Sequence, residues 1–276
     1  MTAGQALILG VVQGMTEFLP ISSIAHLRVV PALLGWPDPG AAFSAVIQLG
    51  TLAAVLVYFA ADMRTMGRAV LRGLADGRPW GKQEARLAWF ILIGTIPIGL
   101  CGVAFKRYIM GEWRSLYVIS GSLIVLGILL WVAEKTATFR REVRHIGWVD
   151  SQLIGLAQAL ALIPGSSRSG TTMTAAIFLG LTREAAARFS FLLGIPAIGA
   201  AGLFELRDLL KHGVGDAGLS YLMIATLTSA VSGYLAIDLL LRYLRTRTTH
   251  VFVWYRIGLG LLLLSLLAAG VLQPLE

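Results

Sequence analysis

Long apolar runs constrain this chain more than any other feature of its sequence. A helix needs roughly 20 apolar residues to cross a bilayer. Six segments meet that length, at about 43–60, 86–104, 115–133, 187–205, 218–241 and 253–272. Of the 276 residues, 57% are hydrophobic and 14% are charged, whereas a soluble domain has roughly 25% charged residues. This composition excludes an ordinary soluble enzyme and a disordered chain, and it predicts an all-α polytopic membrane protein.

Two further apolar regions are interrupted by polar residues. Residues 4–35 are broken by Phe-Leu-Pro-Ile-Ser-Ser at 18–23, and residues 150–181 are broken by Ile-Pro-Gly-Ser-Ser-Arg-Ser-Gly at 163–170. At membrane depth, irregular backbone is tolerated only where it is buried in protein or lines a water-filled cavity. Each region is therefore predicted to form a re-entrant hairpin, two half-length helices that enter and leave on the same side.

The two interrupted regions resemble each other. Residues 6–13 lead to Pro20, and the similar residues 153–158 lead to Pro164. In both halves a Phe-Ser pair starts the next apolar span, 23 residues after the proline in one half and 25 in the other. Each half therefore contains a re-entrant hairpin followed by three spans.

An odd number of spans makes the second half enter the membrane in the opposite orientation. The prediction is one integral membrane domain, 1–276, built as an inverted-topology repeat. Repeat 1 covers about 1–133 and repeat 2 covers about 150–272. In such folds the polar site lies near the bilayer midplane, where the broken helices meet.

The basic residues lie mostly between the apolar spans, so the net charge of +8 is attributed to topology and anionic lipids rather than to nucleic acid. Fifteen Lys and Arg residues fall on one predicted face, in the basic loop 64–86 and in 135–144, 183–188 and 242–247. Only six fall on the other face, at 28, 106–114 and 207–211. The first face is predicted to be cytoplasmic, with both termini outside. Four tryptophans near span ends are expected to anchor the chain at the interface: Trp80, Trp89, Trp113 and Trp148.

Ionisable groups inside membrane segments are costly and are therefore functional candidates. Glu17 lies four residues after Gln13, so the two share a helix face. Ser22, Ser23 and His26 follow just after the break. Together these residues offer a base, a nucleophile and an acid. The structural alternative is that Glu17 caps or pairs inside the bundle and His26 is a hydrogen-bonded interfacial histidine.

The second break places Arg168 among several hydroxyls and two glycines, in the sequence PGSSRSGTT at 164–172. A helix is expected to open near Thr172, and a helix N-terminus attracts phosphate. The guanidinium of Arg168 offers donors that match phosphate oxygens. The structural alternative is a Ser/Thr-capped loop whose arginine snorkels to lipid headgroups. With the first break, the pattern indicates an anion site with acid–base groups, and a phosphorylated lipid is the natural ligand.

These motifs resemble a known family. Residues 13–23 (QGMTEFLPISS) with His26 resemble the first signature of the undecaprenyl-diphosphate phosphatase family of the bacitracin-resistance type, and 164–172 resemble the second. The segment 43–50 (FSAVIQLG) and the order of spans are also similar, over nearly the whole chain. The resemblance implies hydrolysis of undecaprenyl diphosphate to undecaprenyl phosphate, which recycles the carrier lipid for peptidoglycan and gives bacitracin resistance. It further implies a multi-pass enzyme of the bacterial inner membrane, with an active site reached from the periplasmic face.

The resemblance also assigns residues. Glu17, Ser23, His26 and Arg168 match positions linked to catalysis. The expected substrate-binding residues are Gln13, Ser22, Ser167, Ser169, Gly170, Thr171 and Thr172.

Relatives of this type require Mg²⁺ or Ca²⁺, which the resemblance makes the expected cofactor. Many of them have Glu where this chain has Gln13, and Gly where it has Ala25. With one carboxylate fewer, the cation is expected to bridge Glu17 and the diphosphate rather than to sit in a cage of protein ligands.

The expected mechanism uses Arg168 and backbone N–H groups to clamp the diphosphate. Ser23 attacks the terminal phosphorus or positions water, Glu17 accepts a proton or holds the cation, and His26 is the acid–base partner or the nucleophile itself. A transporter or flippase of a phosphorylated polyprenyl lipid is the alternative, since inverted repeats with broken helices also build transporters. The expected partners are the polyprenyl diphosphate, membrane lipids and a second copy of the chain in a homodimer, without nucleic acid.

Overall fold

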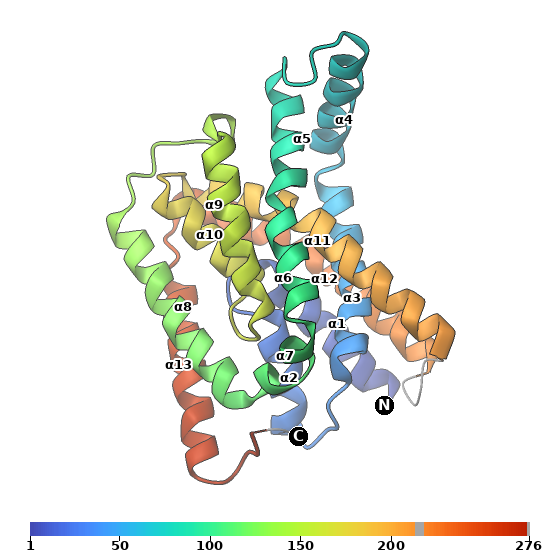
Figure 1. The fold of residues 1–276 in the computed structure, drawn as a ribbon. Helices are drawn as coiled ribbons and strands as arrows, with labels where there is room; N and C mark the ends of the chain where they lie inside the picture. The colour runs from blue at the N-terminus through green and yellow to red at the C-terminus, as the bar shows by residue number, and fades with distance from the viewer. Residues whose placement is uncertain (213–217, 275–276) are drawn as a thin grey trace.

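The protein is all-α in a computed structural model that describes residues 1–212 and 218–274 (Figure 1). The described residues contain no β-strand, only an isolated bridge between Arg141 and Leu181. The α-helices are α1 (Ala3–Phe18), α2 (Ser23–Leu34), α3 (Gly40–Tyr58), α4 (Ala60–Ala75), α5 (Gln83–Gly94), α6 (Ile96–Ala104), α7 (Lys106–Met110), α8 (Leu116–Thr136), α9 (Trp148–Ala159), α10 (Arg168–Phe178), α11 (Arg183–His212), α12 (Leu219–Thr246) and α13 (His250–Ala268). Short 3₁₀ turns are η1 (Glu112–Arg114), η2 (Val143–His145) and η3 (Leu160–Leu162).

The membrane-spanning helices agree with the predicted class. Five described helical stretches are long and apolar enough to cross a membrane: Gln83–Ala104, Leu116–Thr136, Arg183–Arg207, Leu219–Thr246 and His250–Ala268. A sixth span arises only if α3 and α4 are counted as one, and these two helices are bent by 74° at Phe59. The fold is therefore an all-α polytopic membrane protein.

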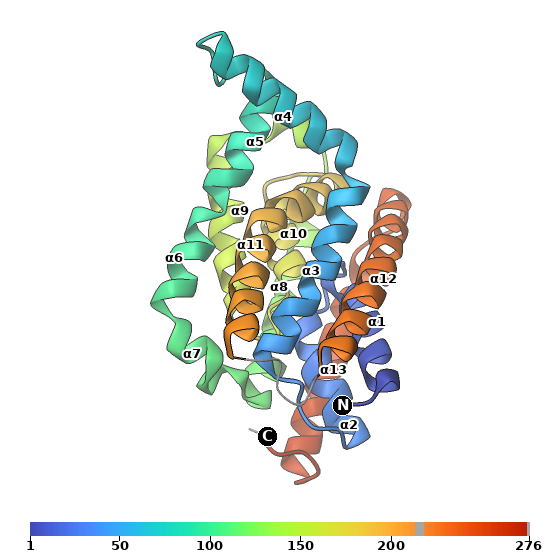
Figure 2. The ribbon, with the colours of Figure 1, turned by 90° about the vertical axis from the view of Figure 1, so that its right-hand side faces the viewer.

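The basic segment 64–86 corrects one prediction. It was expected to be a loop, but its first part is the helix α4. Met66 and Ala69 are buried on one side of this helix, which packs against α5. This amphipathic pattern explains the helix. The α4–α5 connection extends beyond the other helices, and the start of α1 and the end of α13 lie at the opposite end of the molecule (Figures 1 and 2).

Both predicted breaks are present. Helix α1 ends at Phe18 and α2 begins at Ser23. In the second half, α9 ends at Ala159, η3 ends at Leu162 and α10 begins at Arg168. The second helix was expected to open near Thr172, so it begins four residues earlier than predicted. The reason is that the Ser167 side chain caps it, accepting a hydrogen bond from the Gly170 N–H at 3.1 Å.

Small residues let the broken helices pack closely. A Cβ added to Gly10 or Gly14 of α1 would overlap the backbone of α12. A Cβ added to Gly155 of α9 would likewise overlap the carbonyl of Gly94 in α5. Close packing of small residues is the usual way that helices associate in lipid. Helix α10 packs among α8, α9 and α11, which brings its first turn to the end of α1.

Candidate active site

The carboxylate of Glu17 joins the two broken helices. Its Oε1 accepts a hydrogen bond from Nη2 of Arg168 at 2.7 Å. Its Oε2 accepts from Nε2 of Gln13 at 2.7 Å and from Oγ of Ser23 at 2.6 Å. The Glu17 side chain is 5% exposed and the Arg168 side chain 13%. Four predicted site residues, from parts of the chain about 150 positions apart, therefore form one buried cluster.

The two turns share the same local structure. Ser22 and Ser167 are the N-caps of α2 and α10, with φ of 74° and 66°. A positive φ is strained for serine, and such strain concentrates at functional sites. Each cap side chain accepts a hydrogen bond from a backbone N–H three residues on. Ser23 and Arg168 are consequently the first residues of their helices, at equivalent positions that face Glu17.

The remaining predicted substrate-binding residues lie in or beside this cluster. Oγ of Ser169 donates to the carbonyl of Leu19 at 2.9 Å, which ties the second turn to the first. The hydroxyls of Thr171 and Thr172 donate to the carbonyl of Arg168, at 3.1 and 2.7 Å, so they brace the first turn of α10.

His26 makes its hydrogen bonds outside the cluster around Glu17. Its Nδ1 lies 2.7 Å from the carbonyl of Ser22, which can only accept, so Nδ1 carries the proton. Its Nε2 lies 2.6 Å from the hydroxyl of Tyr255, which then donates. The two rings are stacked, with centroids 5.6 Å apart. Within the described residues, no hydrogen bond links His26 to Glu17, Ser23 or Arg168. The structure therefore brings three of the four predicted catalytic residues together and leaves His26 outside.

Comparison with known proteins supports the assignment made from the motifs. The family model for the bacitracin resistance protein BacA matches residues 6–262. The chain belongs to this family. A protein of Myxococcus xanthus (strain DK1622) named undecaprenyl-diphosphatase is 58% identical over 272 residues, 99% of this chain and 91% of the relative. One of Chlorobium phaeovibrioides (strain DSM 265 / 1930) with the same name is 54% identical over 284 residues, 99% of this chain and all of the relative.

Arg256 is a residue of this BacA-family site that the sequence analysis missed. Its side chain is fully buried in α13. Nη1 donates to the carbonyl of Pro20 in the first turn at 3.1 Å. Nη2 donates to the carbonyls of Gly165 and Ser166 in the second turn, at 3.2 and 2.9 Å. One guanidinium thus binds both turns. The sequence does contain a feature that could have indicated Arg256: it is a charged residue inside the apolar run 253–272, and such positions are often functional in membrane proteins.

Gly194 of α11 is a second missed position in this BacA-family chain. A Cβ added there would overlap the Arg168 guanidinium. The glycine therefore leaves the room that Arg168 needs to reach Glu17, and nothing in the sequence pattern of α11 indicates this.

We expect Gly194→Ala to lower kcat/KM for the reaction at this site by about 10-fold, because the added methyl group displaces the Arg168 guanidinium. Arg168 is flexible at its far end, so the fold should persist. Gly199→Ala on the same helix is the matched control, since its Cβ meets only Leu52, at 3.7 Å. If Gly194→Ala kept the kcat/KM of wild type, or if both variants lost kcat/KM equally, Gly194 would not be needed to make room for Arg168.

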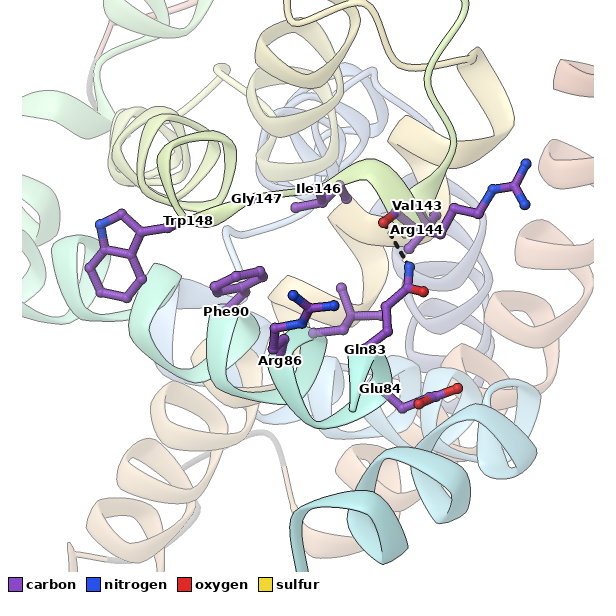
Figure 3. A pocket seen from close by; sticks show the side chains of 10 residues that line it. Gln83, Glu84, Arg86, Phe90, Val143, Arg144, Ile146, Gly147 and Trp148 are labelled. Carbon is purple, nitrogen blue, oxygen red and sulfur yellow. Dashed lines mark hydrogen bonds between the residues drawn. The ribbon is translucent and has the colours of Figure 1, made fainter. Parts of the chain in front are cut away.

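A cavity of about 510 Å³ lies away from this cluster, between the first turns of α5 and α9 (Figure 3). None of the predicted site residues lines it.

Proposed function

We propose that this chain hydrolyses undecaprenyl diphosphate to undecaprenyl phosphate and inorganic phosphate, and so recycles the carrier lipid used for peptidoglycan synthesis and gives bacitracin resistance. The family and the names of the relatives support this activity. The observation that carries the proposal is the contact of 2.6 Å between Oγ of Ser23 and the carboxylate of Glu17. A hydroxyl held at this distance from a base is the arrangement of an activated nucleophile.

The charges of the site suit a diphosphate. In this structure Glu17 offsets Arg168, whereas the described residues provide no carboxylate partner for Arg256. The cluster therefore keeps a surplus positive charge. Nη1 of Arg168 and Oγ of Ser166 are also buried without a hydrogen-bond partner among the described residues. Buried donors of this kind are costly unless a ligand or water binds them, and phosphate oxygens would accept from both.

In the mechanism that we propose, each oxygen of Glu17 has its own task. Oε1 holds Arg168, which clamps the diphosphate and neutralises charge in the transition state. Oε2 takes the proton of Ser23 as Oγ attacks the terminal phosphorus. The bond from that phosphorus to the bridging oxygen breaks, and undecaprenyl phosphate leaves. Water then attacks the phosphorus of the phosphoserine, Glu17 returns its proton to Oγ of Ser23 as the bond from phosphorus to Oγ breaks, and inorganic phosphate leaves.

A divalent cation fits this site only with help from the substrate. The described residues contain no group of three or more His, Cys, Asp or Glu that could hold a metal ion. Oε1 of Gln13 is buried without a partner among them, beside Glu17, and both are the oxygen ligands that Mg²⁺ or Ca²⁺ prefers. Gln13 and Glu17 would hold the cation, with the diphosphate completing its shell. Such a cation would neutralise charge on the phosphate oxygens.

Replacement of Gln13 by glutamate is expected to lower the Mg²⁺ concentration that gives half-maximal phosphate release by about 10-fold, because it adds a second carboxylate beside Glu17. Titration of the chelated enzyme with Mg²⁺ measures this. Gln5→Glu, the same change in the first turn of α1, is the control and should leave the Mg²⁺ midpoint unchanged, since glutamate also fits the capping box that Gln5 forms with Thr2. An unchanged or higher midpoint for Gln13→Glu would contradict the cation site.

We further propose that the enzyme lies in the bacterial inner membrane with its site reached from the periplasmic side. The support is the excess of basic residues around the α4–α5 connection, at the end opposite the start of α1 and the end of α13 (Figure 2). That the chain pairs with a second copy stays a prediction, which its molar mass in detergent would check.

The deciding experiment is phosphate release by the purified protein from undecaprenyl diphosphate in detergent, with and without EDTA. We expect one phosphate per lipid, undecaprenyl phosphate as the product, and loss of turnover in EDTA. The Ser23→Ala variant controls for phosphatases that co-purify. A folded wild type that binds the lipid but releases no phosphate, with Mg²⁺ or Ca²⁺ supplied, would overturn the proposal and favour transport.

A further inference from the structure

The cavity between α5 and α9 has a simple structural origin. The two helices touch where Gly155 meets the carbonyl of Gly94, and they separate toward their first turns. The 3₁₀ turn η2 closes the space on a third side, held by a hydrogen bond of 2.7 Å from Nε2 of Gln83 to the carbonyl of Arg144. The resulting volume of about 510 Å³ is within the range of ligand sites, roughly 300–1,000 Å³.

The residues around the cavity are typical of the boundary between membrane and water. Gln83, which lines it, is also the first residue of the apolar span Gln83–Ala104. Aromatic rings lie close together beside the cavity. The ring centroids of Phe90 and Trp148 are 6.4 Å apart, and those of Trp80 and Phe90 are 6.2 Å apart. Trp148 is half exposed. Tryptophan rings gather where a membrane meets water, so we expect the opening to face lipid headgroups on the arginine-rich side of the protein.

The lining combines an apolar floor with a charged rim. Phe90 and Ile146 are buried and form part of the floor, while Arg86 and Arg144 are exposed (Figure 3). Nε of Arg144 pairs with Glu142 at 3.0 Å. In the part of the chain that the structure describes, Arg86 has no ion pair with a carboxylate. An unpaired cation beside an apolar floor fits an amphiphile with an anionic headgroup.

We propose that this cavity binds an anionic phospholipid, with its phosphate at Arg86 and its acyl chains along Phe90 and Trp148. Basic pockets between transmembrane helices on the cytoplasmic side are a known form of lipid recognition. Glu84 lies at the same rim, and its negative charge favours the single charge of a phosphodiester over the higher charge of a phosphate monoester. The bulk phospholipid therefore fits better than a polyprenyl phosphate. The site is independent of the proposed phosphatase activity.

Lipid retention by the full-length protein in detergent tests this site. The probes are phosphatidylglycerol, phosphatidylcholine and undecaprenyl phosphate, followed by native mass spectrometry. We expect phosphatidylglycerol to bind at least about 10-fold more tightly than phosphatidylcholine. The double variant Arg86→Gln/Arg144→Gln should lose this preference. The matched control Arg68→Gln/Arg72→Gln removes the same charge from exposed positions of α4 and should keep it.

Three results would overturn the proposal. Equal binding of the two phospholipids by wild type would exclude an anion site. An equal loss of the preference for phosphatidylglycerol in the control variant would show that the lipid is attracted to the basic surface as a whole and not to the cavity. Binding of undecaprenyl phosphate that is tighter than that of phosphatidylglycerol in wild type, and that the Arg86→Gln/Arg144→Gln variant loses, would assign the cavity to the carrier lipid. Phosphate release is measured on the same samples and should be unchanged in both double variants, so loss of lipid binding and absence of phosphatase activity are separate outcomes.

Discussion

Alanine at position 23 is expected to reduce kcat for phosphate release by about 10³-fold or more, because the attacking oxygen is removed. The methyl side chain of alanine fits the space of serine, and the N-cap hydrogen bond of α2 comes from Ser22, so the fold should be retained. The lipid should still bind, since Arg168 and Arg256 remain. The initial rate of phosphate release at saturating substrate gives kcat, and binding of the intact lipid is measured separately.

His26→Gln is the comparison that separates the two candidate nucleophiles. Both ring nitrogens of His26 are engaged, with the Ser22 carbonyl and the Tyr255 hydroxyl, and neither contacts the Glu17 cluster. Loss of the imidazole should therefore lower kcat by no more than about 10-fold. If His26→Gln abolished turnover while Ser23→Ala kept more than a tenth of it, the nucleophile would be the histidine.

The two re-entrant turns were predictable because membrane burial restricts what such a sequence can do. A proline followed by hydroxyls inside an apolar run cannot face lipid, so both breaks had to turn inside the protein. The similarity between the two halves then predicted that the breaks meet. The contact between Glu17 and Arg168 shows that the two breaks do meet.

The rest depends on packing that no local pattern reveals. Arg256 is distant in sequence from both turns, and only the packing of α13 against α8 brings its guanidinium to them. Gly194 matters because of the side chain that passes it. His26 follows the Glu17 motif closely in sequence, yet the direction of α2 and the position of Tyr255 turn its ring to another partner. The motif gave proximity along the chain but not side-chain direction.

Arg256→Lys is expected to lower kcat by about 10²-fold with a smaller change in KM, because the two turns would lose their common anchor. The guanidinium reaches the carbonyls of Pro20, Gly165 and Ser166 in different directions. A lysine has a single donor nitrogen and cannot span them. Small errors in the placement of Glu17 against Arg168 are enough for a loss of this size. Steady-state kinetics with undecaprenyl diphosphate separates kcat from KM, and unfolding in detergent measures stability.

The control for Arg256→Lys is Gly260→Ala, one turn further along α13. Its added Cβ would press on Ile124 and the Ser120 carbonyl of α8, which loosens the same helix pair without touching either turn. Gly260→Ala should therefore lower the unfolding temperature, yet it should lower kcat of the folded protein much less than Arg256→Lys, because the Arg256 guanidinium still binds both turns. An equal fall of kcat in both variants would mean that Arg256 contributes only to helix packing. Arg256→Lys could instead keep kcat within about 3-fold of wild type, which is roughly 0.7 kcal/mol in the activation barrier. That result would mean that the two turns keep their relative position without the guanidinium, through the Ser169–Leu19 hydrogen bond and the Glu17–Arg168 pair alone.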